Sequence, residues 1–153
     1  MKFTTTRFGT LEVSCDELFL FPGGLIGLEK RRQWALLPDP DQPTLAWLQS
    51  TTRGELALPM ISPRAFVPEY RAKIAGRDLS FLRLRPDTET FLLTTVTIGD
   101  GAGGDRVATT NLRAPIVLNI AAKLGGQVVT TDDQPIRHPL PSFAGSGSIR
   151  HAA

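Results

Sequence analysis

A proline between two β-prone runs limits most strongly how this chain can fold. Residues 107–110 and 116–119 are rich in β-branched and other apolar side chains, and Pro115 precedes the second run. Proline has no backbone N–H and disfavours the α conformation at the preceding residue, Ala114, so no helix can run through this stretch. The sequence therefore predicts a strand, a kink and a second strand. Three consecutive apolar residues in the second run predict a strand with neighbours on both faces.

The composition is typical of one soluble domain built from short strands. The chain has 153 residues, of which 41% are hydrophobic and 21% charged, as in ordinary globular proteins. Its 14 glycines and 12 prolines favour short strands over long helices. No apolar run approaches the ~20 residues that span a bilayer, and the N-terminus lacks the apolar segment of a signal peptide. With Cys15 as the only cysteine, no intrachain disulfide can form, which is consistent with the cytoplasm.

The charge balance is mildly basic, with a net charge of +2 and an isoelectric point of about 9.0. This excess does not by itself argue for nucleic acid. The densest basic cluster is Lys30, Arg31 and Arg32. We interpret it as a solvated loop, because so short a cluster supports only weak, salt-sensitive contacts with phosphate.

Apolar runs separated by turn residues predict an all-β fold, a single-domain antiparallel β-barrel of about nine or ten short strands with little helix. Trp47 is expected in the core, and Pro59 marks an edge or a bulge because it cannot donate to a ladder. One helical turn is expected within residues 63–70 and another within 120–124. The predicted strands cover residues 11–13, 18–21, 34–37, 45–48, 55–61, 79–84, 90–98, 107–110, 116–119 and 127–131.

Residues 99–104 match the pattern G-x-G-x-x-G letter for letter. A dinucleotide site would also need a helix that opens at the third glycine, because the helix N-terminus binds the pyrophosphate. The residues that follow are β-branched and lead into another predicted strand. We therefore interpret this segment as a flexible hairpin loop.

No constellation of catalytic or metal-binding residues stands out. Neither histidine, His138 or His151, has further ligands at metal-binding spacing, and no nucleophile, Walker or zinc-protease motif occurs. Cys15 is interpreted as a small apolar residue. The sequence predicts no enzyme, no cofactor and no metal, although a hydrolase that uses Cys15 or His138 remains an alternative.

Residues 110–119, TNLRAPIVLN, contain the pattern N-L-x-A-P-I-x-x-N and resemble a block of the FliW family of flagellar assembly factors. Other blocks of the same family match in the same order along the chain. They are FPGGLIGLE at 21–29, AWLQS at 46–50, PRAFVPEY at 63–70, QVV at 127–129 and PIRHPL at 135–140. The resemblance implies a FliW-like β-barrel domain over residues 1–140, and residues 141–153 are expected to be a disordered tail because they are rich in Pro, Ser, Gly and Ala.

The resemblance also implies a function. Proteins of this family are non-enzymatic and cytoplasmic; they bind newly made flagellin, and they bind the translational regulator CsrA and relieve its repression of flagellin translation. The chain would then be a monomer when free, with no membrane or nucleic acid as a partner. Its net positive charge departs from the acidic surface expected to meet CsrA, although Glu29, Asp132 and Asp133 allow a local acidic patch.

An alternative is a small basic β-barrel that binds RNA directly. Such a module carries aromatic residues interleaved with Lys or Arg on one strand face, and residues 81–85, FLRLR, are the one candidate.

Two irregular segments are the candidates for partner binding, because loops on a rigid barrel tend to carry binding residues. Unassembled flagellin exposes apolar terminal helices, and a binder for them needs an apolar groove with a polar rim. The glycine-rich loop at 21–29 and the kink before Pro115 combine accessible apolar and polar groups. We therefore expect Ile26, Leu28, Asn111 and Arg113 to contribute to partner binding, although Asn111 could equally bond backbone at the bend.

Overall fold

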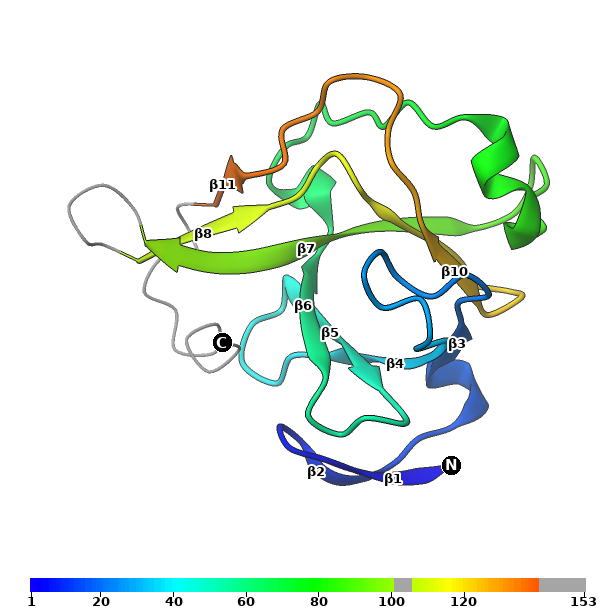
Figure 1. The fold of residues 1–153 in the computed structure, drawn as a ribbon, viewed down its shortest axis with the longest axis vertical. Helices are drawn as coiled ribbons and strands as arrows, with labels where there is room; N and C mark the ends of the chain where they lie inside the picture. The colour runs from blue at the N-terminus through cyan, green and yellow to red at the C-terminus, as the bar shows by residue number, and fades with distance from the viewer. Residues whose placement is uncertain (101–105, 141–153) are drawn as a thin grey trace.

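The computed structural model describes residues 1–100 and 106–140, and the segments 101–105 and 141–153 lie outside this description. Most of the regular secondary structure of the described chain is strand, as predicted, and the remainder is three short 3₁₀ helices (Figure 1). The strands are β1 (Lys2–Thr5), β2 (Gly9–Glu12), β3 (Leu18–Leu20), β4 (Gln33–Pro38), β5 (Leu45–Ser50), β6 (Ala57–Ile61), β7 (Thr90–Asp100), β8 (Arg106–Thr110), β9 (Ile116–Asn119), β10 (Leu124–Gln127) and β11 (His138–Pro139). The 3₁₀ helices are η1 (Cys15–Glu17), η2 (Pro63–Ala65) and η3 (Gly76–Leu82).

Seven strands close into a barrel. The main sheet has the order β11-β8-β7-β6-β5-β4-β3-β10-β9, and an additional pairing of β7 with β9 joins the sheet into a ring. The pairs are antiparallel except for β10 with β3, which meet at Leu124 and Leu20. Strands β1 and β2 form a separate hairpin below the barrel in Figure 1. The predicted all-β antiparallel barrel is confirmed.

The proline kink makes this closure possible. β8 pairs with the second half of β7, from Val96 to Asp100, and β9 pairs with its first half, from Thr90 to Leu93. The kink between β8 and β9 therefore lets two successive strands use the same long neighbour. The predicted strand, kink and second strand are confirmed.

The barrel interior is filled by side chains from strands all around the ring. Trp34 of β4 and Met60 of β6 are fully buried there with Ile116 and Leu118 of β9. Trp47 is fully buried in a second cluster, its Nε1–H donates to Asp39 Oδ1 at 2.8 Å, and Arg7 lies over its ring. The core position expected for Trp47 is confirmed.

Pro59 lies where the ladder between β6 and β7 has already ended. β6 pairs with β5 along its whole length, but it pairs with β7 only at Met60 and Ile61. A residue that cannot donate is tolerated at such a position. The strand is interior, and the proline lies on a stretch of it that is open toward β7.

Four local predictions were wrong. Residues 79–82 of the predicted strand 79–84 form the second half of η3 instead, because Leu79 and Leu82, three apart, pack into one cluster beside β9 and β10. Gly125 and Gly126 lie inside β10 instead of ending a helical turn, and residues 128–131 are not assigned as strand. Cys15 is exposed in η1 and not packed as a small apolar residue.

These corrections affect two alternative functions. The aromatic and basic strand face suggested for RNA binding at residues 81–85 is not formed, because η3 runs to Leu82 and Arg83 adopts a left-handed conformation. Cys15 precedes β3, whereas His138 lies in β11, and these strands lie on opposite sides of the molecule in Figure 1.

No helix of the described residues is long and apolar enough to cross a membrane.

Candidate functional site

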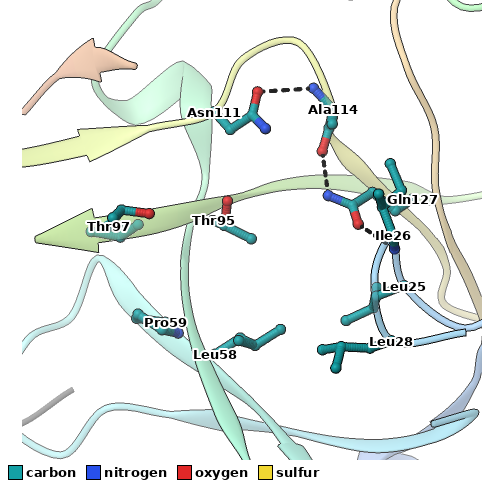
Figure 2. Close-up of a pocket in the computed structure, with 11 residues that line it drawn as sticks. Leu25, Ile26, Leu28, Leu58, Pro59, Thr95, Thr97, Asn111, Ala114 and Gln127 are labelled. Carbon is teal, nitrogen blue, oxygen red and sulfur yellow. Dashed lines mark hydrogen bonds between the residues drawn. The ribbon is translucent and has the colours of Figure 1, made fainter. Parts of the chain in front are cut away.

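A cavity of about 350 Å³ opens at the mouth of the barrel, where the glycine-rich loop faces the kink (Figure 2). Its apolar walls come from Leu25, Ile26 and Leu28 of the loop and from Leu58 and Pro59 of β6. Its polar groups come from β7, the kink and β10. These are Thr95, Thr97, Asn111 and Gln127. An apolar cavity with a few polar groups at the mouth of a barrel is a typical binding site.

The loop is held in one conformation by its own backbone. Leu25 and Leu28 exchange backbone hydrogen bonds and form a small bridge. Gly24 has φ of +65°, and a Cβ atom there would lie 2.6 Å from the backbone of Glu29. Only glycine fits this turn, so the PGG sequence fixes the direction in which the loop crosses the barrel mouth.

Asn111 organises the kink. Its Oδ1 accepts hydrogen bonds from the backbone N–H groups of Arg113, at 3.0 Å, and Ala114, at 3.2 Å. Because both partners can only donate, the oxygen must face the kink and Nδ2 must face the other way. Within residues 1–100 and 106–140 the Nδ2 group donates no hydrogen bond, and Asn111 lines the cavity. The side chain thus bonds the backbone of the bend, which was the alternative to partner binding, and its NH₂ group remains a donor at the cavity.

Neighbouring segments anchor the kink from outside the barrel. The Tyr70 hydroxyl donates to the Leu112 carbonyl at 2.7 Å, and the Thr130 N–H donates to the Arg113 carbonyl at 2.8 Å. Burial raises the pKa of Tyr70 to about 12, with a further contribution from the charge of Asp132. The phenol is therefore a neutral donor at physiological pH.

Gln127 connects the loop to the kink. Its Oε1 accepts the N–H of Ile26 at 3.0 Å, and its Nε2 donates to the Ala114 carbonyl at 3.0 Å. Figure 2 shows this side chain between the two segments.

Three of the four residues expected from the sequence meet at this cavity. Ile26 is 56% exposed and Leu28 is half-buried, and both line the cavity with Asn111. Arg113 does not line it. Its side chain points into a neighbouring depression of about 290 Å³ beside residues 129–133, where it forms an ion pair with Asp133.

Sequence reasoning missed the residues that complete the cavity. Leu58, Pro59, Thr95 and Thr97 lie on strands, and alternation along a strand indicates only a half-buried sheet. For Gln127 a signal existed, because it opens one of the blocks that resemble the FliW family. Its partners are 101 and 13 residues away, and no local pattern reports such distances.

The arrangement is suited to binding. The cavity offers apolar contact area and amide groups, and none of the residues that line it is charged. Within the described part of the chain, no three His, Cys, Asp or Glu side chains are grouped to hold a metal ion. The depression beside Arg113 contains Asp132. The largest single effect on its carboxyl group is desolvation, which raises the pKa. Hydrogen bonds from Gln134 and other groups outweigh this effect, so the pKa is lowered and the carboxylate form is favoured.

Comparison with known proteins agrees with the resemblance of the sequence blocks. A family model described as FliW protein matches residues 2–140. The flagellar assembly factor FliW of Bdellovibrio bacteriovorus is 35% identical over 141 residues, which cover 92% of this chain and 79% of that protein. The FliW of Moorella thermoacetica is 33% identical over 152 residues, which cover 97% of this chain and 95% of that protein.

The fold agrees as well. A crystal structure of the flagellar assembly factor FliW superposes with a TM-score of 0.79 at 27% sequence identity, and the match covers 91% of this chain and 96% of that chain. The family model, the relatives and the barrel lead to the same assignment. This chain belongs to the FliW family of flagellar assembly factors.

Proposed function

We propose that this chain binds flagellin in the cytoplasm, that it also binds the translational regulator CsrA and relieves its repression, and that it does so without catalysis and as a monomer when free. Occupancy by one partner would release the other, so the protein would couple the flagellin level to flagellin translation.

The preformed cavity at the barrel mouth is the observation that carries the flagellin proposal. It combines apolar walls with Asn111 and Gln127 amides, and the exposed Ile26 side chain stands at its edge. An amphipathic helix binds by placing apolar anchors into such a groove while the polar rim contacts its backbone or polar face. Ile26, Leu28 and Asn111 are the residues we assign to this contact.

Arg113 belongs to the second, adjacent surface. Its ion pair with Asp133 and its neighbours at residues 129–132 place a cation and two carboxylates side by side. This local charge pattern is available to a charged partner even though the whole chain is net positive. We therefore assign Arg113 to a polar contact, and CsrA is the partner whose binding it would affect.

Calorimetric titration of the purified protein with flagellin, and separately with CsrA, tests the proposal. We expect Ile26→Asp to weaken flagellin binding at least tenfold, since a buried charge without a partner disfavours the complex. Ile136→Asp is the matched control, because Ile136 is also an exposed isoleucine, at 54%, and does not line the cavity.

The second surface has its own pair of variants. Arg113→Glu places like charges beside Asp133 and is expected to change CsrA binding more than flagellin binding. Arg137→Glu, at an exposed position, makes the same charge change elsewhere. If the wild-type protein binds neither flagellin nor CsrA at micromolar concentrations, the proposed function is refuted. If all folded variants bind as the wild type does, the choice of surface is refuted.

A further inference from the structure

The side-chain amide of Gln127 bonds both segments that form the mouth of the cavity. Gln127 lies at the end of β10, between the loop and the kink. Its Oε1 accepts a hydrogen bond from the loop, and its Nε2 donates one to the kink. The orientation of this amide is unambiguous, because the Ile26 N–H can only donate and the Ala114 carbonyl can only accept. Exchanging the two amide atoms would break both hydrogen bonds.

The hydrogen bond to Ile26 differs in kind from the others in the loop. Leu25 and Leu28 bond each other, and the Gly27 N–H donates to Glu29 Oε2 at 2.7 Å. These local bonds define the shape of the loop but do not fix it against the barrel. The bond from Gln127 spans 101 residues of sequence and sets the distance between the loop and the kink.

We infer that Gln127 is a positioning residue that holds the loop against the kink, so that the mouth of the cavity is already formed and Ile26 already presented before a partner arrives. This inference rests on the proposed function for its binding consequence. A preformed site does not lose loop entropy on association, and its affinity is correspondingly higher.

The first measurement needs no partner. Backbone ¹⁵N relaxation of the free protein is expected to give Ile26 an order parameter of about 0.8 in the wild type and below about 0.6 in Gln127→Ala. Gln134→Ala is the matched control, because Gln134 also makes two side-chain hydrogen bonds, to Arg71 and Asp132, but not at the cavity. We expect Gln134→Ala to leave the Ile26 order parameter unchanged.

The second measurement is titration of the same three proteins with flagellin. Gln127→Ala is expected to bind about tenfold more weakly, as loss of two neutral hydrogen bonds and added loop freedom would give. Gln134→Ala is expected to bind as the wild type does. A melting temperature within a few degrees of the wild type shows that the barrel remains folded.

Gln127→Glu separates positioning from general packing. The introduced carboxylate still accepts from Ile26 but cannot donate to the Ala114 carbonyl, and the proximity of that oxygen raises the pKa of the introduced group above its usual ~4.3. Protonation restores a donor. Flagellin affinity of this variant, divided by that of the wild type at each pH, should therefore rise as the pH falls toward that pKa.

Equal Ile26 order parameters in the wild type and Gln127→Ala would overturn the inference. So would looser loop motion together with unchanged flagellin affinity. If the wild type does not bind flagellin at all, the proposed function fails, and the order parameters alone decide whether Gln127 positions the loop.

Discussion

At the scale of the residue, single polar side chains fix the irregular backbone of this protein. Asn111 satisfies two N–H groups at the kink, and Tyr70 satisfies the carbonyl of Leu112 from a position that is only 3% exposed. Each side chain supplies a hydrogen bond to a backbone group of the bend that has no partner on a neighbouring strand. The kink is therefore defined by side chains as much as by Pro115.

Tyr70→Phe should cost about 1 kcal/mol of unfolding free energy at neutral pH, because the Leu112 carbonyl loses its donor. Below about pH 10 the phenol is protonated in both the folded and the unfolded chain. As the pH rises from there to about 12, the pKa of the folded phenol, only the unfolded chain releases the proton, so the wild type loses up to roughly 2–3 kcal/mol that the variant does not lose. Urea denaturation of both proteins across this range measures the difference, and parallel pH profiles would contradict it.

At the scale of the element, β10 shows why glycine can be required inside a strand. A Cβ atom on Gly125 would lie 2.5 Å from the ring of Phe21, and one on Gly126 would lie 2.5 Å from the ring of Phe81. The two aromatic rings lie against the backbone on opposite faces of the strand. Glycine here provides space for packing, and it does not terminate the strand.

The two glycines should respond differently to alanine. Phe21 is fully buried in the barrel, whereas Phe81 is 39% exposed and can turn away. We expect Gly125→Ala to cost about 2–3 kcal/mol through overpacking and Gly126→Ala to cost less than about 1 kcal/mol. Thermal or urea denaturation compares them directly, and equal costs would show that the two rings are equally constrained.

At the scale of the whole molecule, closure of the barrel decides where the site lies. The pairing of β7 with both β8 and β9 brings the kink to the mouth of the ring, opposite the loop that follows β3. The two segments are about ninety residues apart in sequence, and closure alone places them on one cavity. Leu140, which directly follows β11, is buried against β8 and donates its N–H to the Ala108 carbonyl.

Truncation after Leu140 should leave the fold and flagellin binding intact. Leu140 completes a buried cluster, and the residues that follow are mostly Pro, Ser, Gly and Ala, which offer little apolar area for packing. The prediction concerns residues outside the described part of the chain and is tested by the melting temperature and flagellin titration of the shortened protein. A large drop in either would show that the segment docks on the barrel.

Much of the fold could be predicted because its signals are local. Prolines and glycines end strands by backbone chemistry, so the runs around Trp34, Trp47 and Pro115 were found with nearly correct bounds. The conformation of residues 79–84 was predicted wrongly, because the leucines at 79, 82 and 84 fit the two-residue period of a strand as well as the three-residue period of a 3₁₀ helix. Their packing against β9 and β10 selects the helical period, and that packing depends on segments far away in the sequence.

The order of prolines, glycines and apolar runs is enough to predict an all-β barrel like that of the FliW family, and it locates the loop and the kink from which Ile26, Leu28 and Asn111 line the cavity. It does not predict that these segments face each other, that Arg113 lies in a separate depression, or that Gln127 bonds both sides, and these relations emerge from the folded chain. The reason is the separation along the sequence over which each kind of interaction acts. Steric and hydrogen-bonding preferences of the backbone act over a few residues and can be read in order, whereas a cavity forms where chain closure brings distant segments within a hydrogen bond of each other.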